Sequence, residues 1–386
     1  MITRADVDAL SRLGSDQWPI VSLILRIDKE RIDDDYTIRL KNLLRQAADT
    51  LDDRFDATQR KAVLEDLERI REFFRDEGDR FGRGVAVFAS SQAGIWQVHE
   101  LPRDVESQIS IGFEAHVAPL IKILEQLEPF VTCLIARDSA RLFYGRLGTF
   151  EELQRIVDED VPGQHDQGGW SQARYERHID EHARAHFKRV ADELFHLFEE
   201  QPYRWLILGG PDEVVAAFLE QLHPYVRERH AGTVRVLMEA NINEVHEESC
   251  EIIRRWMLDE KLRAIEMLRN EVASGDRGVA GLEPTLMALQ QGQILTLLVD
   301  DSYQAPGAVC LNCRSVQREG GTGQECIFCG GPLQALDDVV PEIVTGAFRQ
   351  GANLLFLTQP ETQEPMRDLG QIGALLRFSL TPQSEA

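Results

Sequence analysis

The sequence predicts an α/β protein of three domains, each a mixed sheet with packed helices, with a small four-cysteine insertion in the last domain. Short apolar runs typical of buried strands alternate with segments whose apolar residues recur every three or four positions, as in amphipathic helices. A chain of 386 residues is longer than one hydrophobic core usually organises. We place the domains at residues 1–125, 126–243 and 244–386.

The first domain is predicted from a strand, two helices and a hairpin. Residues 21–27 are almost continuously apolar and form the strand, and residues 38–51 and 58–74 have helical periodicity. Residues 85–89 and 95–98 flank a turn that contains a glycine, which is a hairpin signal. This order indicates an N-terminal α/β domain.

The middle domain is predicted to open with strands at residues 130–136 and 141–144 and to continue with a long helix over residues 171–200. Further strands are expected at residues 205–208 and 234–238. One buried stripe defines the long helix, formed by Ile179, Ala183, Phe187, Val190, Leu194 and Phe198.

A polar, glycine-rich segment at residues 161–172 precedes this helix and is expected to be an exposed loop. Gly168 and Gly169 give its backbone access to conformations that other residues avoid. On the helix, Arg177, Arg184 and Lys188 lie opposite the buried stripe. A glycine tip on a rigid helical base suggests a segment that reaches into a partner.

Three histidines lie along the border of the helix stripe, at His178, His182 and His186. Two of them could ligate a metal as in His-Glu-x-x-His helices, but no glutamate occupies the corresponding place and no third ligand is identified. We expect a partly buried polar border or imidazoles that face RNA.

The last domain is predicted to open with helices that carry Ile252, Trp256 and Ile265, and to end with a closing strand within residues 369–378. Between them we expect a helix at residues 285–292 feeding a strand at 294–299, then a helix at 341–350 feeding a strand at 354–357.

Four cysteines lie between that first strand and the helix that follows, as two close pairs: Cys310, Cys313, Cys326 and Cys329. Two such pairs supply four thiolates, which fit a tetrahedral structural zinc site with no open position. The sequence therefore predicts a zinc ribbon at residues 310–329, with a redox pair or a chance array as the alternatives. Cys133 and Cys250 are isolated and expected to be small buried residues.

The composition, 43% hydrophobic and 28% charged, is that of an ordinary globular protein. The formal net charge of -23 argues against a protein that coats nucleic acid, so no DNA partner is expected, although local RNA contact stays open. There is no apolar run long enough to span a membrane and no signal-peptide core at the N-terminus. We expect a cytoplasmic protein without a membrane partner.

The order of these features resembles the archaeal and eukaryotic class-1 peptide chain release factors and Pelota, and among them the bacterial archaeo-eukaryotic-type release factors. The resemblance rests on the paired strands near residue 130, the Gly-Gly loop with its Arg-bearing helix, and the C-terminal order of elements, over roughly residues 127–380. In this family the loop carries Gly-Gly-Gln, which enters the peptidyl transferase centre and promotes hydrolysis of peptidyl-tRNA. Here Trp170 stands where the family has glutamine, and the nearest glutamine is Gln172.

The resemblance implies a ribosome-associated protein whose partners are rRNA, peptidyl-tRNA and a translational GTPase. It assigns catalytic roles to Gly168, Gly169, Trp170 and Gln172, where the amide of Trp170 or the side chain of Gln172 would replace the missing glutamine. Contacts with RNA are expected from His165, Arg174, Arg177, Arg184 and Lys188.

Two functions stay open from the sequence: ribosome rescue by hydrolysis of peptidyl-tRNA, or a non-hydrolysing factor of hibernation or quality control, with a protein-binding scaffold as a further alternative. Trp170 would stack on an rRNA base in the binding case or anchor the loop on its own domain. The family's stop-codon motifs are absent and the corresponding segment, residues 28–35, is acidic. We therefore do not expect codon reading.

Overall fold

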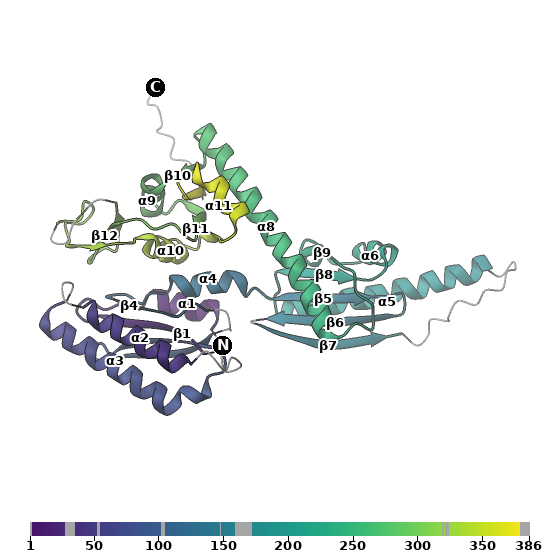
Figure 1. Cartoon of the computed structure of the whole chain (residues 1–386). Coiled ribbons are helices and arrows are strands. Elements are labelled where there is room, and N and C mark those ends of the chain that lie inside the picture. The colour runs from purple at the N-terminus through teal and green to yellow at the C-terminus, as the bar shows by residue number, and fades with distance from the viewer. Residues whose placement is uncertain are drawn as a thin grey trace, which may run out of the picture. The chain divides into compact units, whose positions relative to one another are not determined.

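A computed structural model describes residues 2–378 except 28–34, 52–54, 102–104, 147, 159–171, 319 and 321–323. The chain divides into two compact units, one made of Met1–Gln126 together with Lys261–Ala386 and the other of Leu127–Glu260. The mixed helix and strand content agrees with the predicted α/β class (Figure 1). None of the described helices combines the length and the apolar character that a membrane span requires.

The N-terminal part of the first unit contains a four-stranded sheet in the order β3-β2-β1-β4. Its strands are β1 (Ile20–Arg26), β2 (Gly84–Ser90), β3 (Ile95–Leu101) and β4 (Gln108–Gly112). Every pairing is antiparallel, so the prediction of a mixed sheet is wrong for this part. The reason is that every connection between successive strands, including the two helices between β1 and β2, reverses the direction of the chain.

Helices α2 (Tyr36–Asp49) and α3 (Ala57–Glu77) pack on one face of this sheet. Leu40 and Leu44 of α2 and Val63, Leu67 and Ile70 of α3 are buried there, which confirms the predicted helical periodicity. Asp56 caps α3 in a capping box with Gln59, so this helix begins where its first backbone donors find acceptors. Helices α1 (Arg4–Ser11) and α4 (Ala118–Gln126) complete this part of the chain.

The C-terminal part of the first unit has a four-stranded sheet in the order β10-β16-β11-β15. The strands are β10 (Gly278–Ala280), β11 (Ile294–Asp300), β15 (Asn353–Leu357) and β16 (Ile372–Leu376), and helices α9 (Leu282–Gln290), α10 (Val340–Arg349) and α11 (Pro360–Arg367) connect them. Because β11 and β15 are parallel while β16 is antiparallel to β10 and β11, this sheet is mixed as predicted.

A small antiparallel sheet in the order β13-β12-β14 lies in the chain between β11 and α10. It consists of β12 (Gly307–Cys310), β13 (Val316–Gln317) and β14 (Leu333–Leu336). Its own small core contains Ala308, Cys310, Cys326 and Leu333. The cysteine-bearing insertion therefore falls at the predicted place in the chain.

The second unit is built on a five-stranded mixed sheet in the order β7-β6-β5-β8-β9. The strands are β5 (Phe130–Ile135), β6 (Ser139–Arg146), β7 (Thr149–Val157), β8 (Trp205–Gly209) and β9 (His230–Val234). Helices α5 (Gln172–Glu200), α6 (Asp212–Leu219) and α7 (Pro224–Arg227) contribute to one core cluster (Figure 1). The first part of α8 (Ile242–Ser274) contributes to a second cluster with Phe130, Phe143 and Trp205.

Two of the predicted elements differ in the structure. The strand expected at residues 234–238 is wrong, because β9 ends at Val234 and pairs with β8 from His230 onward. Gly232 explains the earlier position, since a β-carbon there would lie 2.8 Å from Cγ2 of Ile252 on α8, so only glycine lets the strand pass so close. The separate helices expected after residue 243 are a single helix, α8.

Candidate functional site

The glycine-rich loop follows the hairpin of β6 and β7 and precedes α5, so the sheet and the longest helix of the second unit supply its two ends. Gly168, Gly169 and Trp170, together with His165, lie outside the described residues. Gln172, Arg174 and Arg177 belong to the first turns of α5.

The described chain before the glycine-rich segment ends at Asp158, which several contacts hold in place. Its backbone N–H donates to the carbonyl of Asp138 over 2.8 Å, which extends the hairpin by one residue. Its Oδ2 accepts from Nη2 of Arg189 on α5 over 3.1 Å and lies 3.6 Å from Nδ1 of His186. These contacts of Asp158 connect the end of the β6–β7 hairpin to α5.

His186 itself is completely buried, so of the two alternatives expected for the histidines, an imidazole that faces RNA is wrong for this residue. It lies next to Phe187, on the side of α5 that packs on the sheet. Burial, which outweighs the carboxylates of Asp158 and Asp138, lowers the pKa of the imidazole. At neutral pH the ring is therefore uncharged, and Arg189 is the cation that balances Asp158.

The outer face of α5 agrees with the predicted pattern. Ala183, Phe187, Val190 and Leu194 are buried in the core. Arg184 and Lys188 are exposed, so this side of the helix presents cations to solvent in a strongly acidic chain.

The four cysteines form the second candidate site. Their four Sγ atoms lie within 4.8 Å of one another. The Sγ atoms of Cys310 and Cys329 are 3.5 Å apart, and those of Cys313 and Cys326 are 3.7 Å apart. These separations are well beyond a disulfide bond of about 2.05 Å, so the sulfurs converge without being joined.

The two cysteine pairs have matching backbone turns. In the first, the N–H of Arg314 donates to the carbonyl of Cys310, and in the second the N–H of Gly330 donates to the carbonyl of Cys326. Arg314 and Gly330 both adopt a left-handed conformation, with φ of 61° and 69°. The chain therefore forms the same tight turn twice, and each turn presents two sulfurs to a common point.

Hydrogen-bond donors surround the sulfurs. The backbone N–H groups of Asn312 and Cys313 donate to Sγ of Cys310, each over 3.4 Å, and the N–H of Phe328 donates to Sγ of Cys326 over the same distance. The side-chain amide of Gln317 donates to Cys326 over 3.1 Å. Donors aimed at sulfur stabilise its thiolate form, which is the form that binds a metal.

Although burial raises the pKa of the Cys326 thiol, the hydrogen bonds from Ser315 and from backbone N–H groups lower it to about 6. The N–H of Gly331 similarly lowers the pKa of Cys329. Four convergent sulfurs fit a closed tetrahedral metal site with only sulfur ligands. The sequence located the four cysteines, but it did not identify Gln317 and Ser315 as hydrogen-bond partners of Cys326, because a pattern of cysteines carries no information on what surrounds them.

Comparisons with known proteins find similar sequences and structures. A profile of the family described as "Bacterial archaeo-eukaryotic release factor family 10" matches residues 116–254. Peptide chain release factor subunit 1 of Pyrococcus abyssi is 24% identical over 371 residues, covering 87% of this chain and 89% of that protein. The protein of the same name from Thermococcus sibiricus is 24% identical and covers 97% of this chain and 96% of its own length.

Solved structures of Pelota are also similar. Pelota of Archaeoglobus fulgidus is 16% identical with a TM-score of 0.35, covering 98% of this chain and 93% of its own. A ribosome-bound archaeal Pelota, solved with ABCE1, is 15% identical with a TM-score of 0.42, covering 98% of this chain and 95% of its own.

The chain is thus similar to peptide chain release factor subunit 1 over nearly its whole length. The segment from just before α4 to the first half of α8 is similar to bacterial archaeo-eukaryotic release factor family 10.

Proposed function

We propose that this protein is a ribosome-associated translation factor that rescues ribosomes by hydrolysing peptidyl-tRNA without reading a stop codon. The observation that carries the proposal is the near full-length similarity to peptide chain release factor subunit 1, which spans 97% of this chain and 96% of one relative. A factor of this kind acts in the cytoplasm, so the cytoplasmic location is part of the same proposal.

In this proposal the loop residues perform the chemistry. Gly168 and Gly169 let the backbone approach the ester bond, and the amide N–H of Trp170 donates to the oxyanion that develops during hydrolysis. Gln172 supplies a side-chain amide that positions water. The contacts of Asp158 with Arg189 support the assignment, because they fix one end of the loop on a rigid helix.

The cations of α5 are proposed to contact RNA. Arg184 and Lys188 are exposed on one helix, and Arg174, Arg177 and His165 precede them in the sequence toward the loop. A local row of cations can bind phosphates although the net charge of the chain is -23.

A non-hydrolysing ribosome-binding factor is the second candidate. Trp170 favours it, because an indole in place of the family's glutamine removes the side-chain amide and supplies a surface that stacks on a base. A translational GTPase is a proposed partner in either case.

We further propose that the cysteines hold one structural zinc ion as a zinc ribbon, and that the chain has three domains, the first of which ends near residue 125. The convergence of four sulfurs in two matching turns supports the zinc assignment. The zinc would hold Cys310, Cys313, Cys326 and Cys329 together and would take no part in hydrolysis.

Release of a labelled nascent chain from stalled ribosomes tests the hydrolysis. Gly168→Ala and Gly169→Ala are each expected to lower the release rate by about a hundredfold or more, because an added methyl group blocks the backbone approach. Gly82→Ala is the matched control, since a β-carbon at Gly82 meets no atom within 4 Å. Gln172→Ala distinguishes a role of that side chain from a role of the Trp170 amide.

No release by the wild-type protein, with ribosome binding intact, would discard hydrolysis in favour of the binding factor. Trp170→Ala would then weaken ribosome association if the indole stacks on rRNA, and would leave it unchanged if the indole anchors the loop.

A further inference from the structure

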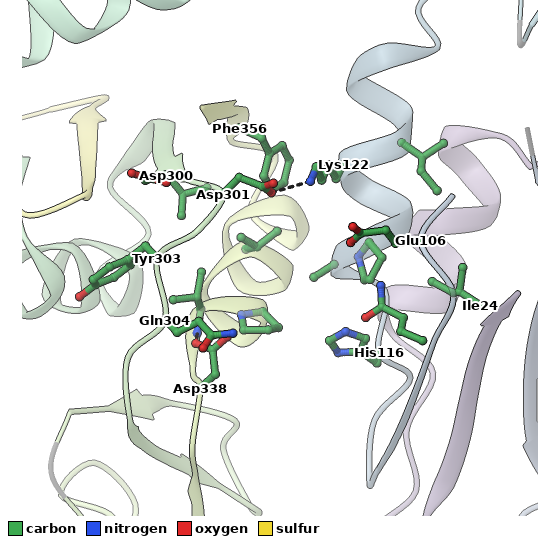
Figure 2. Close-up of a pocket in the computed structure, with 18 of the residues that line it drawn as sticks. Ile24, Glu106, His116, Lys122, Asp300, Asp301, Tyr303, Gln304, Asp338 and Phe356 are labelled. Carbon is green, nitrogen blue, oxygen red and sulfur yellow. Dashed lines mark hydrogen bonds and ion pairs between the residues drawn. The ribbon is translucent and has the colours of Figure 1, made fainter. Parts of the chain in front are cut away.

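The first unit contains a cavity of about 510 Å³ that the sequence did not indicate. One wall is formed by β1, the segment just before β4 and α4, and the other by the end of β11 and by α10 (Figure 2). A neighbouring hollow of about 240 Å³ shares His116, Asp338 and Pro341 with it. We call the two together the acidic cleft.

The described lining of the larger cavity carries four carboxylates, from Glu106, Asp300, Asp301 and Asp338, and one ammonium group, from Lys122. The Lys122 ammonium already forms an ion pair, because its Nζ lies 2.6 Å from Oδ1 of Asp301 across the cavity (Figure 2). The smaller hollow adds Glu114, Asp337 and Glu342 against Arg314. Arg314 is likewise engaged, with its Nε 3.2 Å from Oε1 of Glu114.

Some of the carboxylates have structural roles and others do not. Oδ1 of Asp300 accepts from Ser302 and Gln363, and Oδ1 of Asp338 accepts from two backbone N–H groups. Within the described part of the chain, Oδ2 of Asp338 and the whole carboxylates of Glu106 and Glu342 have no hydrogen-bond or ion-pair partner. These oxygens are therefore free to accept hydrogen bonds from a ligand.

His116 lies between the two parts of the cleft and faces it from the wall opposite Asp338 (Figure 2). Its backbone N–H donates to Ser22, but its ring has no hydrogen-bond partner among the described residues. The residue keeps some exposed surface toward the cavity, while the surrounding atoms enclose the ring enough for desolvation to lower its pKa to about 4. At neutral pH it is thus an uncharged imidazole with one ring nitrogen available as an acceptor.

The unpartnered carboxylate oxygens of Glu106 and Asp338 are acceptors, so the cleft suits a ligand that carries donors and positive charge. A single metal ion does not fit, because the cysteines form the one group of three or more metal-ligating side chains that converges in the described part of the chain. The carboxylates are instead spread along the cleft, with apolar side chains of Ile24, Ile123, Val344 and Phe356 in the larger cavity.

Separated carboxylates with apolar surface among them match a flexible alkyl chain that bears several ammonium groups. We propose that the acidic cleft binds a linear polyamine, with its ammonium groups at Glu106, at Asp338 and at the ring of His116. A cavity of this volume is large enough for a small organic ligand.

Calorimetric titration of the full-length protein with spermidine, at an ionic strength of about 0.1 M, tests the proposal. We expect saturable binding of one spermidine. The double variant Glu106→Gln/Asp338→Asn is expected to bind about tenfold or more weakly, because two charged acceptors are replaced by neutral ones. Asn at 338 keeps an oxygen for the two N–H groups that Asp338 accepts, and circular dichroism checks that the variant is folded.

The double variant Asp192→Asn/Glu220→Gln is the matched control, since it removes the same charge from exposed positions on α5 and just after α6. It is expected to bind spermidine as the wild type does. Equal weakening by both double variants would show attraction to the overall acidic surface and would overturn the proposal. Absence of spermidine binding, or binding of a lysine-rich peptide in its place, would also overturn it.

Discussion

At the scale of single residues, Glu342 on α10 shows how burial changes the protonation state of a carboxyl group. Enclosure by surrounding atoms and the nearby Glu114 and Asp338 raise the pKa of this carboxyl to about 7, against the opposing effect of Arg349 and Arg314. The folded protein therefore holds a proton on Glu342 between about pH 4.5 and pH 7, where the unfolded chain has lost it. Stability from this group is lost as the pH rises through that interval.

Glu342→Gln is accordingly expected to raise the free energy of unfolding at pH 8 by on the order of 2 kcal/mol and to change it little at pH 4. Thermal and urea unfolding at the two pH values would measure this difference. Glu364→Gln, at an exposed position on α11, is the control and should change neither value. Equal effects of Glu342→Gln at both pH values would contradict the assignment.

The same scale shows what a sequence pattern can and cannot predict of a site. Cysteine spacing predicted the convergence of Cys310, Cys313, Cys326 and Cys329, because tight turns leave few ways to arrange two close pairs. The burial of His186 and the partnership of Asp158 with Arg189 could not be predicted, since they depend on how α5 packs in three dimensions against the hairpin that precedes it.

At the scale of secondary structure elements, the two cysteine turns depend on Gly331, which follows the second cysteine pair and packs beside the first. A β-carbon at Gly331 would lie 2.7 Å from Cβ of Asn312 and 3.2 Å from Sγ of Cys329, which would push the two turns apart. Gly331→Ala is therefore expected to weaken zinc retention, although it removes no sulfur.

Metal analysis of the purified protein, never exposed to chelator, is expected to find about one zinc per chain. Cys326→Ser should bring this close to zero, and Gly331→Ala should lose zinc to a chelator faster than the wild type does. Cys250→Ser is the control, because Cys250 packs on the core of the second unit and should leave the zinc content unchanged. A wild-type protein without zinc would refute the metal assignment.

Most elements could be predicted at this scale, because their apolar periodicity is set locally. The prediction of separate helices after residue 243 failed for an identifiable reason. The buried residues of α8 first serve the core that contains Val245 and Ile253 and later the core that contains Ile265 and Leu268, so the stripe changes side. With no glycine or proline in residues 242–274, the helix continues through the change.

At the scale of the whole molecule, the second unit lies within the sequence of the first, which resumes at Lys261. Glu260 and Lys261, the residues on either side of this boundary, each form an ion pair within their own unit. Nζ of Lys261 lies 2.9 Å from Oε1 of Glu125 in the first unit, and Arg204 donates to both carboxylate oxygens of Glu260 in the second. The backbone N–H of Arg204 also donates to the carbonyl of Pro129, so the second unit ties its own two ends together.

A fragment of residues 127–260 is therefore expected to fold alone and to unfold cooperatively, because it keeps both of its core clusters. A fragment of residues 127–243, which ends at the boundary expected from the sequence, would lose Val245, Ile253 and the Arg204 partner Glu260. Burial of one such aliphatic side chain contributes about 1.5–3 kcal/mol, so we expect the shorter fragment to be less stable by several kcal/mol. Urea unfolding followed by circular dichroism compares the two fragments. Equal stability would show that the first part of α8 is dispensable to this unit and would place its end at residue 243.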